Sequence, residues 1–265
     1  MITDTKVVVK GAGDLASGVI YYLAQAGFQV VATELAQPLV VRRTVSFAEA
    51  IYQGSFVVEG VMAKKAVDFG EIESVLEQGQ VPILVDPQAE VINFWQPQVV
   101  VDATMAKRNL GTDIEDAPLV IALGPGFEAA CDADIVIETK RGHNLGRLIY
   151  NGQAEANTGV PGEIAGYTEQ RVLKSPHKGN FKPAKAIGEE IAAGEVFGYV
   201  EQSAVQAEVS GVIRGLLKSG VSVKEGTKLG DIDPRGRKKN CYTISDKARS
   251  LGGAILMAIL VNIDN

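Results

Sequence analysis

The chain has 265 residues, of which 46% are hydrophobic and 22% are charged, so it can bury a sizeable core in one large domain or two smaller ones. Its formal net charge is −6, with 26 basic residues against 32 acidic residues. This excess of acidic residues disfavours a nucleic-acid partner, because non-specific binding to phosphates needs surplus Lys and Arg. The two cysteines, Cys131 and Cys241, are too few for a disulfide framework and indicate a reducing compartment.

The sequence predicts no membrane segment. The N-terminal residues MITDTKVVVKG lack the basic start and the long apolar run of a signal peptide. The most apolar late stretch, residues 252–261, is much shorter than the roughly 20 residues that span a bilayer. We therefore expect a soluble, cytoplasmic protein without a membrane partner.

The N-terminal region predicts a strand, a glycine turn, a helix and a second strand. The run KVVVK at residues 6–10 is typical of a parallel strand buried on both faces. A helical pattern follows the turn and ends at Gly27, which is suited to a C-cap, and residues 28–32 form a second apolar run. This order is that of a nucleotide-binding βαβ unit.

The alternation of strands and helices continues to about residue 165. Helices are expected near residues 47–52 and 70–78, and strands or extended segments near residues 56–61, 82–85, 98–102, 119–123 and 135–138. Such alternation predicts right-handed crossovers and a parallel sheet. The predicted fold class is therefore α/β, with a Rossmann-like, nucleotide-binding domain over residues 1–165.

Beyond residue 165 the sequence becomes rich in glycine and contains an internal repeat. Residues 187–200 align without gaps on residues 219–232, with glycines and apolar residues at matching positions. Two such halves resemble the biotinyl/lipoyl carrier family, so a smaller, β-rich barrel-sandwich domain is expected over residues 166–240. The corresponding hairpin tip at residues 201–205 lacks the lysine to which those carriers attach their cofactor, which favours a structural or docking module.

The last segment, residues 241–265, predicts a helix. Ser245 is a good N-cap, and Ala248, Leu251 and Ile255 lie on one apolar face after it. We expect this C-terminal helix to pack on the body of the protein.

The glycine turn is the first candidate cofactor site. Gly11 permits a tight turn and Gly13 allows the backbone to approach a pyrophosphate, while Asp14 and Leu15 begin a helix whose free amides and dipole favour an anion. Glu34 ends the second strand, where a ribose-binding acid is expected. Asp14 is unusual, because it places a negative charge beside the phosphate position. The alternative is a turn that serves packing alone.

The end of the strand near residue 102 is the second candidate site. Asp102, Thr104 and Lys107 follow a buried run, and ligands of open parallel sheets bind beyond the carboxyl ends of the strands. These three side chains are therefore candidates for cofactor binding. The competing interpretation is an ordinary polar loop with a cap at Asp102 or Thr104.

The segments LGPGF (123–127) and RGHNLGR (141–147) form the third candidate site. Gly124 and Gly126 give a loop with little side-chain bulk, suited to backbone contact with a ligand, although most such sequences are simple turns. The Arg141 guanidinium suits phosphate or carboxylate oxygens, and the His143 imidazole suits proton transfer or a hydrogen bond to a ligand.

Several other chemistries are disfavoured because their motifs are missing. His143 and His177 are the only histidines, and neither cysteine lies at metal-ligand spacing from them, so no metal site is predicted. The sequence contains no P-loop and no G-x-S-x-G elbow, which disfavours a P-loop NTPase and a serine hydrolase. No catalytic residue is assigned.

Several ordered blocks carry a family resemblance: VKGAGDLASGV (9–19), VVVDATMAKRN (99–109), ALGPGF (122–127), VIETKRGHNLGRLIY (136–150), TGVPGEIAGYTEQRVLKSP (158–176) and PRGRKKNCYTISDKARSLGGAILMAI (234–259). They resemble the YqeB family, whose members accompany selenium-dependent molybdenum hydroxylases. The LGPGF and RGHNLGR blocks are also similar to XdhC-type chaperones, which bind and insert the molybdenum cofactor of xanthine dehydrogenase-like enzymes. The resemblance implies a maturation factor that handles a molybdopterin dinucleotide.

Two other functions are consistent with the sequence. A NAD(P)-dependent oxidoreductase would use the same glycine turn, and only His143, Lys107 or Tyr150 would supply its acid or base. A non-enzymatic scaffold would use the β-rich half to dock a partner enzyme. The candidate cofactors are thus molybdopterin cytosine dinucleotide or NAD(P), and the candidate partners are a molybdenum hydroxylase, other maturation proteins or a second copy of the chain.

Overall fold

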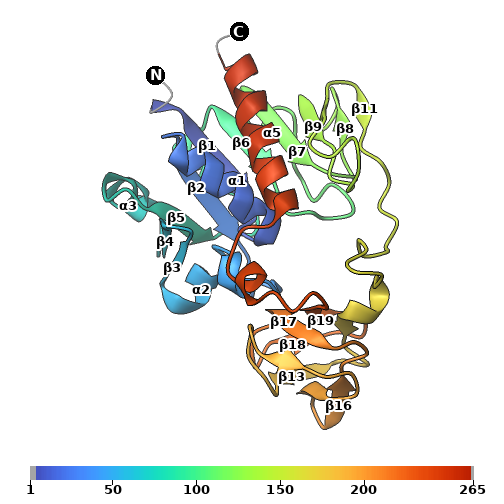
Figure 1. The fold of residues 1–265 in the computed structure, drawn as a ribbon. Coiled ribbons are helices and arrows are strands. Elements are labelled where there is room, and N and C mark those ends of the chain that lie inside the picture. Colours follow the sequence, from blue (N-terminus) through green and yellow to red (C-terminus); the bar gives the residue numbers. More distant parts are fainter. Residues whose placement is uncertain (1–3, 264–265) are drawn as a thin grey trace. The chain divides into compact units, whose positions relative to one another are not determined.

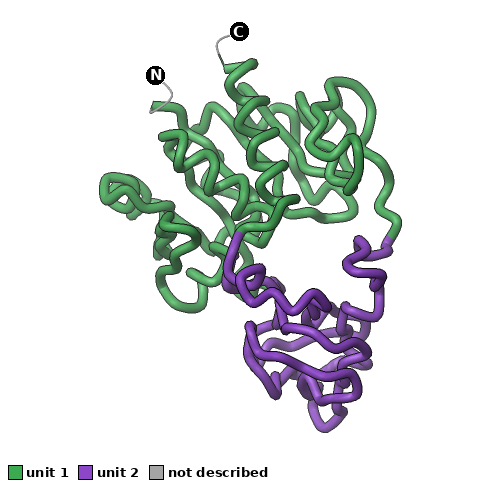
Figure 2. Tube along the Cα trace, in the orientation of Figure 1, with its two compact units in different colours: residues 1–38, 46–158, 244–265 green, residues 39–45, 159–243 purple. Residues whose placement is uncertain are grey.

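The computed structural model describes residues 4–263, which fold as two compact units (Figure 2). Unit 1 comprises residues 1–38, 46–158 and 244–265, and unit 2 comprises residues 39–45 and 159–243. Both units are therefore assembled from segments that are distant in the sequence. The last helix of the chain belongs to unit 1, although most of unit 2 precedes it in the sequence.

Unit 1 is built around a nine-stranded sheet with the order β10-β9-β7-β6-β1-β2-β5-β4-β3 (Figure 1). Its strands are β1 (Lys6–Lys10), β2 (Gln29–Glu34), β3 (Ser55–Val58), β4 (Val61–Lys65), β5 (Val81–Val85), β6 (Val99–Asp102), β7 (Leu119–Leu123), β9 (Ile135–Ile137) and β10 (Leu148–Ile149). Its α-helices are α1 (Asp14–Gln25), α2 (Glu49–Gln53), α3 (Ile72–Glu77), α4 (Val91–Trp95) and α5 (Asp246–Asn262). The short strands β8 (Glu128–Ala129) and β11 (Gly152–Gln153) pair separately.

The nine-stranded sheet is mixed. Its inner strands run parallel, but β3 pairs antiparallel with β4, and β10 pairs antiparallel with β9. The chain reverses between β3 and β4 at Glu59 and Gly60, which both have positive φ, so a tight hairpin replaces a crossover. In the described residues between β6 and β9, loops and the short β8 connect the strands without an α-helix. The predicted fold class, a Rossmann-like parallel sheet with a barrel-sandwich half, is therefore wrong.

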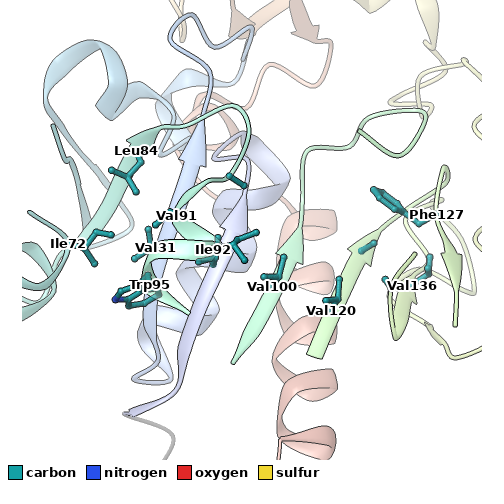
Figure 3. Packing of buried hydrophobic residues seen from close by; sticks show 14 of the residues in the cluster. Val31, Ile72, Leu84, Val91, Ile92, Trp95, Val100, Val120, Phe127 and Val136 are labelled. Carbon is teal, nitrogen blue, oxygen red and sulfur yellow. The ribbon is translucent and has the colours of Figure 1, made fainter. Parts of the chain in front are cut away.

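One face of the sheet packs against α3 and α4 (Figure 3). The parallel register aligns Val8 with Val31 and with Val100, so these side chains point to the same face. They are fully buried together with Ile72 from α3 and lie against Trp95 from α4. Burying each such aliphatic side chain contributes roughly 1.5–3 kcal/mol, which accounts for the continuous apolar runs in these strands.

The helices α1 and α5 lie side by side (Figure 1). A Cβ atom on Gly18 would lie 2.4 Å from the carbonyl oxygen of Ala248, and one on Gly252 would lie 2.6 Å from the carbonyl oxygen of Gly18. A Cβ atom on Gly252 would also lie 2.8 Å from the ring of Tyr22, one turn further along α1. The two helices therefore run parallel in near backbone contact, and their N-termini lie at the same end.

Both predicted helix caps are present. Gly27, with a φ of +91°, follows the end of α1, and the Ser245 hydroxyl accepts a hydrogen bond of 3.2 Å from the amide of Ala248. Within residues 4–263, none of the helices combines the length and the apolar character that crossing a bilayer requires.

Unit 2 contains two antiparallel sheets with the orders β12-β19-β17-β14 and β16-β15-β13-β18. Their strands are β12 (Val172–Lys174), β13 (Gly179–Pro183), β14 (Glu190–Ile191), β15 (Val196–Val200), β16 (Ser203–Gln206), β17 (Gly211–Leu216), β18 (Ser222–Val223) and β19 (Lys228–Asp233). The stacked rings of Phe181 and Phe197, with centroids 6.2 Å apart, lie in its core. Gly230 is required beside them, because a Cβ atom there would lie 2.3 Å from the Phe197 ring.

The internal repeat predicted from the sequence is present in the backbone of unit 2. Gly188 and Gly220 have φ values of +90° and +82°, and Gly194 and Gly226 have values of +84° and +76°. Gly188 and Gly194 flank β14, and Gly220 and Gly226 flank the equivalent strand β18. β15 and β19 follow at matching positions. The repeated glycines are thus explained by repeated turns in the left-handed region.

A buried charge cluster also lies in unit 2. Asp231 is 1% exposed, and its carboxylate lies 3.1 Å from Arg214, 3.2 Å from Lys228 and 3.9 Å from Arg171. Burial by itself raises the pKa of Asp231, but attraction by Lys228, Arg214 and Arg42 outweighs it and holds the pKa well below its ordinary value. The single carboxylate therefore serves as counter-ion for several cations.

We expect Gly252→Ala to be less stable than Gly253→Ala, although both replace a glycine in the same helix. The methyl group at position 252 would overlap the carbonyl oxygen of Gly18, whereas a Cβ at position 253 meets only the Tyr22 ring at 4.0 Å. Overpacking costs about 1–3 kcal/mol, and both variants gain the same helix propensity. Urea unfolding should show this difference. Equal free energies of unfolding would contradict the close helix contact.

We expect Asp231→Asn to destabilise the protein by about 3–5 kcal/mol at pH 7, because the buried cations lose their counter-ion. Since the folded pKa lies below the unfolded one, the stabilisation is present above the ordinary Asp pKa and is lost as the pH falls. Thermal unfolding of wild type and variant between pH 7 and pH 2.5 measures this. A stability difference that stays constant with pH would refute the assignment.

Candidate functional site

The carboxyl ends of β1 and β6 mark the point where the strand order reverses. From β1 the chain builds the sheet outward through β2 and β5, and β6 then pairs with the other side of β1. Ligands of open α/β sheets bind beyond the carboxyl ends of the strands at such a point. Lys10 ends β1, Asp102 ends β6, and the two are register partners. We call the loops that follow β1, β6, β7 and β9 the carboxyl edge.

The glycine turn after β1 is held by its own hydrogen bonds. Gly11 has a φ of +94°, and a Cβ atom there would lie 3.2 Å from the Cα of Thr104 in the loop after β6. The carbonyl oxygen of Ala12 accepts hydrogen bonds from the hydroxyls of Ser46 (2.8 Å) and Ser17 (3.1 Å), both fully buried. The turn therefore requires glycine at position 11 and is fixed in one conformation.

The start of α1 has no side-chain cap. Gly13 is the N-cap residue and supplies no side chain to the first helical amides, among them those of Asp14 and Leu15. Lys247, at the start of α5, lies near Asp14. Burial and repulsion by Arg141 lower the pKa of Lys247, while attraction by Asp14 opposes them. The charge of Asp14, unexpected beside a phosphate position, thus lies within electrostatic range of a lysine from the last helix of the chain.

Glu34 contacts the glycine turn itself. Its Oε2 accepts a hydrogen bond from the amide of Ala12 (3.1 Å), and its Oε1 accepts one from the amide of Leu35 (2.8 Å). Burial raises the pKa of Glu34, and these two hydrogen bonds oppose the rise only in part. The carboxylate therefore supports the turn, and its predicted contact with a ribose stays a prediction.

A buried polar cluster joins the ends of β1 and β6. The Nζ of Lys10 donates to the hydroxyl of Thr112 (2.5 Å), which donates in turn to Oδ2 of Asp102 (2.6 Å). Lys10 Nζ lies 3.9 Å from the same carboxylate oxygen. All three residues are buried, so solvent screens the ion pair only weakly.

Thr104 connects this cluster to the surface. Its hydroxyl and its amide donate to Oδ1 of Asp102 at 2.6 Å and 3.0 Å, and the residue is exposed. Asn109 fixes the rest of the loop, because its side-chain oxygen accepts from the amides of Gly111 (2.9 Å) and Thr112 (2.8 Å). The loop after β6 is therefore anchored at both ends without a helix.

The loop after β7 lies between those after β6 and β9. A Cβ atom on Gly124 would lie 2.6 Å from Oγ1 of Thr139, and one on Gly126 would lie 3.0 Å from the carbonyl carbon of Lys107. Both glycines have positive φ, +82° and +104°. The Lys107 backbone thus packs on Gly126, while the residue itself is exposed. Glycine is needed at both positions for the three loops to touch.

Charged side chains in the loop after β9 are paired with other groups of the protein. The Arg141 guanidinium forms a bidentate ion pair with Asp246, with distances of 2.6 Å and 2.9 Å, at the start of α5. Glu138 is buried, and its carboxylate accepts from the amides of Lys140 (2.7 Å) and Glu155 (2.8 Å). His143 is exposed. The predicted Arg141 fork is therefore already engaged by a carboxylate of this chain.

The structure brings most of the predicted residues to one edge of the sheet and adds others. Direct contacts link Gly11 with Thr104 and Gly126 with Lys107, whereas His143 is linked only through its position in the loop after β9. Sequence reasoning missed Lys10 and Thr112. The only signal was a lysine ending an apolar strand, and its pairing with Asp102 becomes visible only in the register.

In the described part of the chain, no group of three or more His, Cys, Asp or Glu side chains is arranged to hold a metal ion. Cys131 is exposed, and Cys241 is buried in unit 2. Burial raises the pKa of the Cys241 thiol, which disfavours the thiolate form.

Sequence comparison finds a homologue that aligns with almost the whole chain. This relative is a protein of Escherichia coli (strain K12), "Uncharacterized protein YqeB", and is 45% identical over 255 residues. The alignment covers 96% of this chain and 47% of the relative, so the chain spans about half the length of YqeB. The resemblance to YqeB that the sequence blocks predicted is confirmed. No protein-family model matches the chain.

Comparison with solved structures gives only distant likenesses. Product-bound EutE (DoeB) from Ruegeria pomeroyi is 11% identical with a TM-score of 0.27, and a succinylglutamate desuccinylase/aspartoacylase from Rhodobacter sphaeroides is 15% identical with a TM-score of 0.28. An aspartoacylase family protein from Mesorhizobium loti is 12% identical with a TM-score of 0.29. Each comparison covers 86% of this chain and 85% of the other. TM-scores this low carry no argument about function.

We expect Glu34→Gln to become more stable relative to wild type as the pH rises from 4 to 8. The raised pKa of Glu34 makes the ionised carboxylate the less favourable form in the folded protein, so wild type loses stability as the pH rises through that pKa. Glutamine stays neutral and keeps an oxygen acceptor for the turn. Thermal unfolding of both proteins across this range measures the effect. A difference that does not grow with pH would contradict the raised pKa.

Proposed function

We propose that the protein is an accessory protein in the maturation of a selenium-dependent molybdenum hydroxylase, and that its carboxyl edge binds a molybdopterin-type dinucleotide or a related nucleotide. The arrangement of the sequence blocks carries this proposal. The blocks that resemble YqeB and XdhC-type proteins contain the loops after β1, β6, β7 and β9. These are four neighbouring strands of one sheet, so the family-like residues meet at a single edge.

The chemistry of this edge supports a nucleotide ligand. The first turn of α1 presents backbone amides and the positive end of a helix dipole, which suit a pyrophosphate. Gly13 adds no side-chain bulk at the start of this helix, and Gly124 and Gly126 allow the neighbouring loops to pack closely beside it. Beside them, Thr104 and the exposed Lys107 offer a hydroxyl and a positive charge. These residues are the ones that would hold the dinucleotide.

The proposal also names a partner. A protein that loads a cofactor must pass it on, so a molybdenum hydroxylase or another maturation protein is the expected partner. The alternatives are a NAD(P)-dependent oxidoreductase and a scaffold without a nucleotide ligand.

We expect a thermal-shift screen against CTP, CDP, molybdopterin cytosine dinucleotide, NAD(H) and NADP(H) to separate these functions. A ligand at 100 times its dissociation constant adds about 2.7 kcal/mol of stability. Stabilisation by the cytidine nucleotides or the molybdopterin dinucleotide supports the proposal. Stabilisation by NADH alone would refute it in favour of an oxidoreductase, and no response to any ligand would favour the scaffold.

The variant Gly13→Val should abolish the response to the ligand. Gly13 has a φ of −69° and a ψ of −174°, which any residue can adopt, so valine blocks the approach to α1 without straining the backbone. Gly13→Ser is the matched control. A serine N-cap accepts a hydrogen bond from a first-turn amide and so competes with the ligand for it, which should weaken the response while stabilising the free protein. An undiminished response in Gly13→Val would place the ligand elsewhere.

A further inference from the structure

The buried cluster at the ends of β1 and β6 has only one possible direction of hydrogen bonding. The Lys10 ammonium has protons to donate and no lone pair, so the Thr112 hydroxyl oxygen accepts in their 2.5 Å contact. A hydroxyl has a single proton. That of Thr112 must therefore be directed at its other close partner, Oδ2 of Asp102, at 2.6 Å.

Asp102 receives donors on both of its oxygens. Thr112 donates to Oδ2, and the amide of Thr104 donates to Oδ1 at 3.0 Å. The carboxyl group is 1% exposed, and the Lys10 ammonium lies 3.9 Å from Oδ2. A carboxylate that acts only as an acceptor is compatible with each of these donors. The Thr104 hydroxyl, 2.6 Å from Oδ1, therefore also donates to Asp102.

Thr104 is the member of this hydrogen-bonded chain that lies at the surface. It is exposed, while Lys10, Thr112 and Asp102 are buried. The hydroxyl proton of Thr104 is used by Asp102, so only its lone pairs are available to a ligand. We propose that Thr104 is a specificity-determining residue that accepts a hydrogen bond from an N–H or O–H group of the bound nucleotide. Lys10, Thr112 and Asp102 act as positioning residues that fix this polarity.

This inference rests on the proposed nucleotide function. It implies that the phosphates and the donor groups of the ligand bind at two different places. Phosphate oxygens are acceptors, so they match the amides at the start of α1 and do not match Thr104. A base amine, a pterin N–H or a ribose hydroxyl is a donor and does match Thr104. The turn that leads into α1 contacts the Thr104 backbone, because a Cβ atom on Gly11 would lie 3.2 Å from the Cα of Thr104.

The test compares Thr104→Val with the matched control Thr104→Ser. Valine keeps the branched shape and removes the hydroxyl, whereas serine keeps the hydroxyl. Calorimetric titration with CDP and with inorganic pyrophosphate is the measurement. We expect Thr104→Val to bind CDP about tenfold more weakly and pyrophosphate as well as wild type does. Thr104→Ser should bind both like wild type. An equal loss for both probes, or no loss for CDP, would overturn the inference.

A measurement without ligand distinguishes failure of this inference from failure of the proposed function. In the free protein, NMR should detect a hydroxyl proton of Thr104 that is protected from exchange by its bond to Asp102. If wild type binds neither probe, the nucleotide function proposed above fails, and the protected proton still shows that Thr104 presents an acceptor. A rapidly exchanging Thr104 hydroxyl proton would overturn the inference by itself.

Discussion

The backbones of α1 and α5 touch because neither Gly18 nor Gly252 carries a side chain. This contact joins the first helix of the chain to the last one, after the residues of unit 2 have intervened. Since the helices run parallel, α5 begins beside the start of α1. It thereby supplies Lys247 to the surroundings of Asp14 and Asp246 to the ion pair with Arg141. The electrostatics of the carboxyl edge depend on this packing of two helices from opposite ends of the sequence.

The buried cluster of Lys10, Thr112 and Asp102 links the end of β1 to the loop after β6, just as the contact between α1 and α5 links two helices. Crossover helices would normally fix the connections between parallel strands. After β6 polar side chains take that role, because Asp102 and Asn109 accept five hydrogen bonds from amides and hydroxyls of the loop. A hydrogen-bonded buried network is rigid, so the loop after β7 can pack through Gly126 on the loop that it holds.

The glycine turn illustrates how a nucleotide-type signal and its structural use can differ. Glu34 was predicted to bind a ribose, but in the structure its carboxylate accepts a hydrogen bond from the amide of Ala12. The Glu34 carboxylate therefore satisfies part of the hydrogen bonding of the turn, and in the proposed function an anion would bind at the start of α1. Together with the proposed acceptor at Thr104, such a site would offer separate places for phosphate and for donor groups of a dinucleotide.

The sequence by itself determined the elements whose signals are local. Apolar runs predicted the inner strands, Gly27 and Ser245 predicted helix caps, and the glycine repeat predicted the paired turns of unit 2. The parallel sheet was a wrong prediction, because a reversal such as that at Glu59 and Gly60 depends on left-handed backbone geometry that strand patterns do not report. The candidate site was predicted as a set of loop residues, but its chemistry was not. Only the tertiary structure places Lys10 opposite Asp102 and directs the proton of Thr104 inward, because hydrogen-bond polarity is a property of side chains brought together from distant strands.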